Sequence, residues 1–158
     1  MNPVELRRLV LQESKRANVG HIGSSLSVVE IVAALYGGWL RIEDVHDPDR
    51  DRMILSKGHA GLALYCAFHL RGWLSSEELA GYCQDGGLGV HPELGIPGVD
   101  FSTGSLGQGL SMGAGGALAA KLDGSARRVV VLVSDAEHNE GSLWEAAAFA
   151  AHRRLENL

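Results

Sequence analysis

The chain has 158 residues, of which 46% are hydrophobic and 21% are charged, and its formal net charge is −5. This length favours a single domain with a sizeable core, and the composition is that of a soluble globular protein. Because basic and acidic residues are interspersed and the balance is acidic, nothing indicates a nucleic-acid-binding surface.

Cysteine content and hydropathy point to a reducing compartment. Cys66 and Cys83 form neither a CxxC pair nor a disulfide framework, and Cys66 lies in an apolar helical run where a buried thiol is expected. Three charged side chains among the first eight residues interrupt any secretory pattern. The weakly polar stretch 106–120 is rich in glycine and too short to span a bilayer. We expect a cytoplasmic protein without a membrane span.

The first third of the chain reads as helical. A proline near the first turn and a 3.6-residue apolar stripe predict a helix over residues 3–18. The glycines and serines of residues 20–25 break it, and residues 27–39 predict a second, nearly all-buried helix that ends at a glycine pair. A charged loop follows over residues 41–52, where Asp47, Pro48 and Asp49 form a turn signal.

The middle of the chain alternates short elements. Residues 53–56 predict a short strand, after which the chain turns into a helix that ends near residue 70. Another helix starts at Ser75, which has capping-box spacing to Glu78. This alternation of helices and short strands predicts an α/β fold with a mostly parallel sheet flanked by helices.

Glycine is concentrated in the next two segments. Residues 85–104 show no periodicity and carry six glycines and two prolines, and a loop of this length inside a compact domain is usually functional. Residues 106–121 then predict a small-residue helix. Because glycine weakens a helix, so many glycines require a reason such as close packing against a neighbouring helix or sheet.

The last segment contains the clearest strand. Five apolar, mostly β-branched residues at 129–133 predict a strand buried on both faces, as in a parallel sheet. Asp135 follows its carboxyl end, where α/β proteins hold metals and phosphates. The alternative is that Asp135 only caps the next helix.

The final helix is expected to begin near Ser142, which has capping-box spacing to Glu145. Its helical spacing predicts one apolar stripe facing a core, made of Trp144, Ala147, Ala148, Ala151 and Leu155.

Three histidines share a setting, because His21, His59 and His91 each lie in a turn that contains or adjoins a glycine. Their spacing does not match a zinc site, and suits hydrogen bonding to a polar substrate or phosphate. The glycine-rich start of a helix at residues 104–109 is a further candidate site. Alone it is neither a Walker motif nor a dinucleotide fingerprint.

Taken in order, these motifs resemble the N-terminal region of transketolases, most closely the split bacterial and archaeal type in which that region is a separate subunit. The resemblance covers essentially the whole chain. It rests on residues 20–23 (GHIG), 56–60 (SKGHA), 91–93 (HPE), 102–109 (STGSLGQG) and 134–141 (SDAEHNEG).

The resemblance implies a thiamine diphosphate-binding fold with Mg²⁺. Asp135 matches the metal ligand, and Ala136 follows it where a backbone N–H meets the diphosphate. His59 is similar to a diphosphate-contacting histidine. The segment of Gly104, Ser105 and Leu106 matches the one that lines the thiazolium and aminopyrimidine rings.

The resemblance also implies catalytic residues. His21 and His91 match histidines that face the sugar and assist proton transfer, and Glu140 resembles a glutamate that hydrogen-bonds across the subunit interface. Two features depart from the family pattern: Ser134 and Ala136 replace the glycines of the metal motif, and Ser105 stands where many members have proline.

A second metal ligand, an asparagine on the next strand of the family, is expected beyond Leu158, and Asn157 is on the wrong element to replace it. Residues 1–158 are therefore expected to form a single diphosphate- and Mg²⁺-side domain, incomplete at its C-terminal end. The resemblance implies a complementary C-terminal subunit that carries the pyrimidine-binding domain, in a hetero-oligomer built on a dimer.

The expected function is transfer of a two-carbon ketol or acyl unit from a sugar phosphate or related ketose, with activity only when the complementary subunit is present. Two alternatives stay open: a non-catalytic interaction subunit that kept the fold, and a shortened fragment with no independent role.

Overall fold

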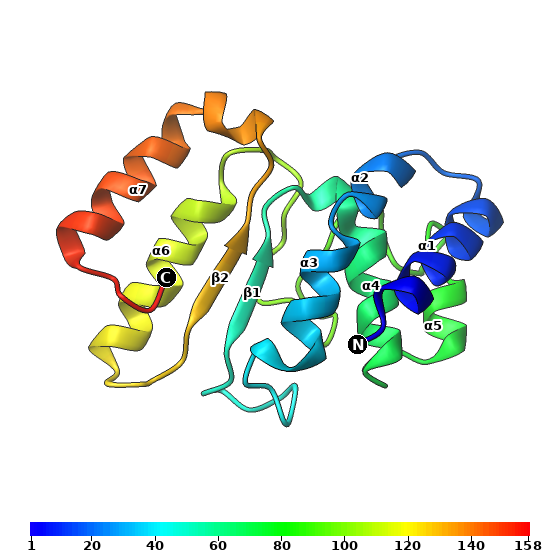
Figure 1. Ribbon diagram of the computed structural model, residues 1–158, viewed down its shortest axis with the longest axis horizontal. Helices are drawn as coiled ribbons and strands as arrows, with labels where there is room; N and C mark the ends of the chain where they lie inside the picture. The colour runs from blue at the N-terminus through cyan, green and yellow to red at the C-terminus, as the bar shows by residue number, and fades with distance from the viewer.

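A computed structural model describes all residues, 1–158, and has two groups of helices separated by a short parallel sheet (Figure 1). Strands β1 (Arg52–Leu55) and β2 (Val129–Leu132) pair in parallel, with Arg52 opposite Val129 and Leu55 opposite Leu132. The α/β prediction with a parallel sheet is confirmed. Both predicted strands exist, each within about one residue of its expected bounds.

The region before β1 departs from the prediction. The first helix is present, but the expected single helix over residues 27–39 starts earlier and is divided into pieces. The Ser27 hydroxyl donates to the Ser24 carbonyl at 2.8 Å, and such local bonding by serine competes with the helical pattern. The elements are α1 (Pro3–Ala17), α2 (Ile22–Leu26), α3 (Val29–Ala34) and a π-helical turn η1 (Leu35–Trp39).

The helices after β1 follow the prediction closely. A 3-10 turn η2 (Gly58–Ala60) leads into α4 (Gly61–Leu70), and α5 (Ser76–Ala80) follows. The capping box between Ser75 and Glu78 is confirmed, with both reciprocal hydrogen bonds present. Residues 85–104 contain neither helix nor strand, as expected.

The second half contains α6 (Gly109–Leu122), a 3-10 turn η3 (Ala136–Asn139) and α7 (Gly141–Arg153). Two glycines of α6, Gly109 and Gly113, have the packing role that was predicted, whereas Gly115 faces open space. A Cβ at Gly109 would overlap the Ser56 side chain at the end of β1, and one at Gly113 would overlap Val131 of β2. Small residues therefore let α6 lie directly on the sheet.

The sheet separates two hydrophobic cores, and Figure 1 shows helices on either side of it. Met53 and Leu55 of β1 face the larger core, which α1, α3 and α4 complete, whereas Ile54 faces the smaller core under α6 and α7. This alternation gives β1 two covered faces. Cys66 of α4 is fully buried in the larger core, as expected, and burial raises the pKa of its thiol.

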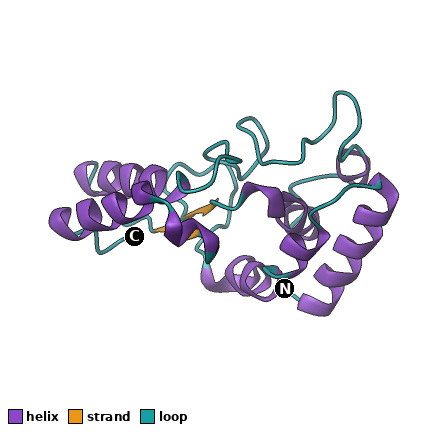
Figure 2. Ribbon diagram, turned by 90° about the horizontal axis from the view of Figure 1, so that it is seen from above, coloured by secondary structure: helices purple, strands orange, loops and turns teal.

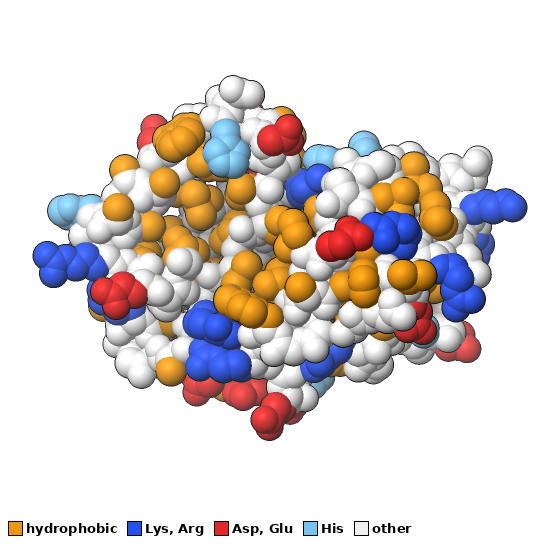
Figure 3. All heavy atoms as spheres, in the orientation of Figure 1, with side chains coloured by type: hydrophobic (Ala, Val, Ile, Leu, Met, Phe, Trp, Pro, Cys, Tyr) orange, Lys and Arg blue, Asp and Glu red, His pale blue; other side chains and the backbone are white.

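β2 is less buried than predicted. Helices cover both of its faces, but only Val129 is buried, and the following residues are half-buried because no strand pairs with its outer edge. The Val129 N–H donates to the Asn157 carbonyl at 2.8 Å, so the chain after α7 returns to this edge. A hollow of about 500 Å³ lies there, on the face where Figure 3 shows hydrophobic side chains beside α6 and α7.

Two predictions for α7 are wrong. Ser142 does not cap the helix; its hydroxyl donates instead to the Gly107 carbonyl at 2.8 Å. The expected core stripe is largely exposed, with Trp144 59% exposed, while Leu143 and Ala146 are buried and only Leu155 of the predicted set lies in the core. An alanine-rich helix has small apolar residues on several faces, so spacing alone did not decide which face packs.

None of the helices combines the length and the hydropathy that a membrane span requires.

Candidate functional site at the carboxyl ends of the strands

The site residues predicted from the sequence lie on loops at the carboxyl ends of β1 and β2, the edge that Figure 2 views from above. His59 follows β1, and Asp135 follows β2. His21 lies between α1 and α2, and His91 lies in the loop of residues 85–104. Ligands of parallel α/β sheets bind at this edge because the strand-to-helix loops and helix amino termini converge there.

His21 and His59 form a pair, with ring centroids 5.3 Å apart. His21 has a left-handed backbone with φ of 65°, a conformation that costs a non-glycine residue about 1 kcal/mol and is concentrated at functional sites. Burial lowers the pKa of His59, and Lys57, His21 and His91 lower it further. A His59 that stays neutral can donate or accept a hydrogen bond.

His91 is held against the loop that precedes α6. The buried Tyr65 hydroxyl donates to the His91 carbonyl at 2.8 Å. A Cβ at Gly104 would lie 3.3 Å from the His91 ring, and a Cβ at Gly58 would lie 2.8 Å from the Gly104 nitrogen. Three segments are therefore in close contact: the turn that carries His59, the loop that carries His91 and the segment of Gly104.

Glu137 joins this assembly to the end of β2. Its side chain is fully buried, and one carboxylate oxygen accepts hydrogen bonds from the Ser56 hydroxyl and the Gly107 N–H. The other oxygen accepts from the N–H and hydroxyl of Ser134. Burial raises the pKa of Glu137, but these hydrogen bonds outweigh it and leave the pKa below its ordinary value.

Gly107 and Glu140 are in direct contact. Gly107 has φ of 81°, and a Cβ there would lie 2.6 Å from the Glu140 Cβ. The close approach brings the start of α7 against the loop before α6. Glu140 itself is exposed and has no ion pair.

Asp135 projects from the end of β2 without a partner inside the chain. It is exposed, its side chain makes no capping hydrogen bond, and no ion pair involves it. The reading in which Asp135 only caps the following helix is wrong. Ala136 is not among the residues with positive φ, so its replacement of a family glycine introduces no left-handed strain.

A hollow of about 220 Å³ lies beside Gly104 and Ser105. Leu106 follows at 39% exposure. The neighbouring Thr103 hydroxyl is buried without a hydrogen-bond partner, an arrangement that native proteins usually reserve for a ligand, water or ion. The glycine-lined hollow, the orphaned hydroxyl and the neutral histidine fit the diphosphate and ring atoms of thiamine diphosphate.

For the metal, no group of three or more His, Cys, Asp or Glu side chains converges anywhere in the chain. Mg²⁺ does not need such a cluster, since it commonly takes one or two carboxylates together with phosphate oxygens and waters. The exposed carboxylate of Asp135 fits one such ligand.

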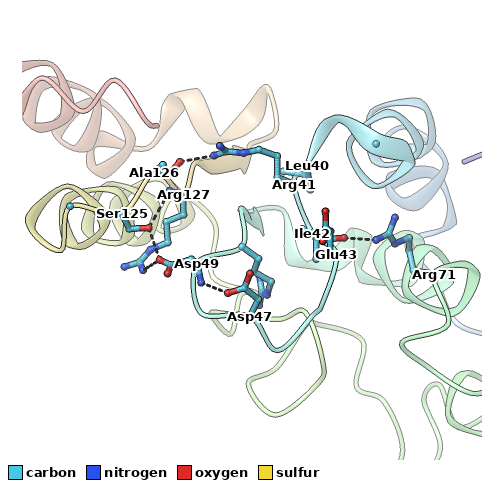
Figure 4. A pocket seen from close by; sticks show the side chains of 13 residues that line it. Leu40, Arg41, Ile42, Glu43, Asp47, Asp49, Arg71, Ser125, Ala126 and Arg127 are labelled. Atoms are coloured by element: carbon cyan, nitrogen blue, oxygen red, sulfur yellow. Dashed lines mark hydrogen bonds and ion pairs between the residues drawn. The ribbon is translucent and has the colours of Figure 1, made fainter.

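A larger hollow of about 760 Å³ lies at the opposite end of the strands (Figure 4). Its arginines are already engaged: Arg41 donates to Asp51 and the Ala126 carbonyl, Arg71 to the Ile42 carbonyl, and Arg127 to Asp123. None of the predicted site residues lines it.

Sequence reasoning gave no role to Glu137, Ser56 or Tyr65, although the first two lie in the motifs of residues 134–141 and 56–60. Nothing in the acidic run of residues 135–140 distinguishes the one buried carboxylate from its exposed neighbours. For a tyrosine or serine in an apolar run, the sequence does not show which loop its hydroxyl will bond to.

The fold and this edge define a class: an α/β protein with a candidate cofactor site at the carboxyl ends of its parallel strands. Comparison with known proteins narrows the class. Residues 3–158 match the family described as transketolase, thiamine diphosphate binding domain, and the chain belongs to that family.

Relatives include both split subunits and whole enzymes. The chain is 44% identical over 158 residues to the 6-deoxy-6-sulfo-D-fructose transketolase subunit SqwG of Clostridium sp. (strain MSTE9), covering 97% of this chain and 57% of that subunit. It is 37% identical to an apulose-4-phosphate transketolase subunit of Phocaeicola vulgatus, covering 96% and 55%. Human transketolase is 40% identical, covering 97% and 25%. The chain thus spans about half the length of the subunits it matches.

Proposed function

We propose that this chain is the N-terminal, thiamine diphosphate-binding component of a split transketolase-like enzyme that transfers a two-carbon ketol or acyl unit. The observation that carries the proposal is the packing of His21, His59 and His91 with the Gly104 loop at one edge of the sheet. The similarity to transketolase subunits supports it.

Each residue has a role in this proposal. When bound, the thiazolium ring of the cofactor supplies the carbon nucleophile and the electron sink. Asp135 would hold Mg²⁺ and the Ala136 N–H would meet the diphosphate. His59 would hydrogen-bond a diphosphate oxygen. The closely packed segment of Gly104, Ser105 and Leu106 would exclude water from the thiazolium and aminopyrimidine rings.

His21 and His91 would face the ketose and move protons to and from its hydroxyl and carbonyl oxygens. Glu140, exposed at the start of α7, would hydrogen-bond across the subunit interface to the half that activates the aminopyrimidine. A neutral histidine can serve as either donor or acceptor at a sugar hydroxyl near pH 7.

We propose further that residues 1–158 form one domain whose sheet continues past β2. The unpaired outer edge of β2, already met by Asn157, supports this. The hollow beside Gly104, at about 220 Å³, is smaller than the roughly 300–1,000 Å³ of typical cofactor pockets. A complementary subunit with the pyrimidine-binding domain would supply the other wall, in a hetero-oligomer built on a dimer.

The substrate class proposed is a sugar phosphate or related ketose, as the names of the subunit relatives suggest for those proteins. A cytoplasmic location is proposed on the two free cysteines. A second candidate function is a non-catalytic interaction subunit that kept the fold, which the exposure of Asp135 without a side-chain partner favours.

The test is to combine the chain with a complementary transketolase subunit, then to titrate thiamine diphosphate by calorimetry, with and without Mg²⁺. We expect Mg²⁺-dependent binding that Asp135→Ala weakens at least about a hundredfold, since removing a carboxylate from a metal–phosphate site costs several kcal/mol. The control is Asp123→Ala, an exposed acid at the C-terminal end of α6 that pairs with Arg127. Equal binding by Asp135→Ala and wild type would contradict the metal assignment, and absent binding by wild type would favour the non-catalytic reading.

A further inference from the structure

Glu137 is a fully buried carboxylate with no ion pair. Four hydrogen-bond donors surround it: the hydroxyl of Ser56, the N–H of Gly107, and the N–H and hydroxyl of Ser134. All four come from uncharged groups. The carboxylate therefore joins the end of β1, the loop before α6 and the end of β2 without any arginine or lysine.

These three segments, which Glu137 joins, lie far apart in the sequence. Gly107 N lies 2.9 Å from one oxygen of Glu137, and Ser134 N lies 2.7 Å from the other. The Ser56 hydroxyl extends the connection by accepting from the Gly109 N–H at 3.1 Å. One side chain thus spans the gap between the loop of residues 104–107 and the turn that carries Asp135.

A carboxylate is the group that suits this place. An ionised carboxylate only accepts hydrogen bonds and has two oxygens, so it satisfies four donors at once. A glutamine of the same shape would direct an NH₂ group at one pair of donors. Stability alone is a weak reason for a buried charge, because well-packed apolar side chains often serve as well or better.

We propose that Glu137 is a positioning residue for the diphosphate end of the cofactor. It holds Gly107 and Ser134 at a fixed separation, so that Asp135 and Ala136 face the segment of residues 104–106. This role rests on the proposed function above, and adds to it a residue that touches neither cofactor nor substrate.

The experiment compares Glu137→Gln with Asp51→Asn in the protein combined with its complementary subunit. Asp51 is the matched control: it is also a buried carboxylate with several hydrogen bonds, at the opposite ends of the same strands. Two quantities are measured, the Kd for thiamine diphosphate at saturating Mg²⁺ and the amide hydrogen exchange of residues 104–109 and 134–137 without cofactor.

We expect Glu137→Gln to raise the Kd about 30-fold, since a buried donor is left without an acceptor, and to speed exchange in both segments about tenfold or more. Asp51→Asn should change the Kd less than about threefold and leave exchange in these segments unaltered. Glu137→Asp keeps the charge but is one methylene too short to span both sides, so it should also weaken binding. If Glu137→Asp bound thiamine diphosphate with the wild-type Kd, the idea that Glu137 acts by spanning the two segments would be contradicted.

The outcomes separate the two proposals. A wild-type complex that does not bind thiamine diphosphate contradicts the proposed function. A wild-type complex that binds, with Glu137→Gln binding equally well, contradicts the positioning role alone.

Should Glu137→Gln fail to fold, Ser56→Ala removes one donor to the carboxylate and is expected to raise the Kd about fivefold. Ser14→Ala, at a buried serine of α1, is its control, and an equal Kd for both variants contradicts the role.

Discussion

The two ends of the sheet each bury a carboxylate, but they satisfy it in different ways. At the amino ends, Asp51 is 1% exposed and receives hydrogen bonds from the guanidinium groups of Arg41 and Arg128. At the carboxyl ends, Glu137 is fully buried and receives hydrogen bonds only from hydroxyl and backbone N–H groups.

The difference separates a structural end from the end that is proposed to bind the cofactor. Two arginines neutralise Asp51, and they also donate to the Ala126 and Trp39 carbonyls. No lysine or arginine forms an ion pair with Glu137, and the cationic side chain near His59 is Lys57, whose ammonium group donates to the Ser27 hydroxyl. A diphosphate at this end could be bound by Lys57, backbone N–H groups and a bound cation, and the cation agrees with the proposed role of Asp135.

The largest expected effect tests the structural end. Asp51→Ala leaves the guanidinium groups of Arg41 and Arg128 beside an empty acceptor position, and we expect it to lower the free energy of unfolding by about 3–5 kcal/mol. Urea unfolding followed by circular dichroism measures this. A loss below about 1 kcal/mol, the range of surface ion pairs, would mean that the amino ends are not held by this cluster.

Substituting one glycine at each end of the sheet compares how closely the two ends are packed, because both glycines have a similar left-handed backbone. Gly107 at the carboxyl end and Gly124 at the amino end both have left-handed φ, 81° and 68°, but only Gly107 has a neighbour within reach of an added Cβ. Gly124→Ala should cost about 1 kcal/mol for the backbone alone. Gly107→Ala should cost about 2–3 kcal/mol because Glu140 must also move.

Thermal unfolding of both variants measures this difference. Equal losses for Gly107→Ala and Gly124→Ala would show that the contact between Gly107 and Glu140 is loose.

The smallest expected effect is a pH dependence at the amino end. Burial raises the pKa of Asp51, but hydrogen bonds from Arg41 and Arg128 outweigh it and hold the pKa well below its usual range. The stability that ionised Asp51 contributes is therefore complete above its unfolded pKa of about 4 and is lost as the pH falls below that value, through the folded pKa.

Unfolding free energies measured between about pH 2.5 and pH 7 should fall more steeply with acid for wild type than for Asp51→Asn. Parallel curves for the two proteins would remove Asp51 from the acid-sensitive groups.

Much of the fold was predictable where the signal is local. The capping box of Ser75 and Glu78, the apolar run of β2 and the glycines of α6 each depend on neighbours in sequence or on backbone sterics. The helix over residues 27–39 and the packed face of α7 were mispredicted. In the first case, the local hydrogen bond from the Ser27 hydroxyl to the Ser24 carbonyl competes with the helix. In α7, partners distant in sequence decide which of several similar faces packs.

The candidate site shows the same division. His21, His59, His91 and Asp135 could be selected from the sequence because their motifs occur in the order that a known family has. The roles of Ser56, Tyr65 and Glu137 could not be predicted, because each acts on a loop more than twenty-five residues away or through its burial.

The sequence by itself determined the α/β class, the strands, most of the helices and the family. It did so because residue spacing, caps and motif order are properties of a short stretch of chain. Only the tertiary structure decided which carboxylate of the acidic run is buried and which face of α7 packs. It also decided that arginines stabilise the buried carboxylate at one end of the sheet, whereas uncharged donors stabilise the one at the other end. Those outcomes depend on which segments meet in space, and a buried charge is tolerated only where such a meeting supplies its hydrogen bonds.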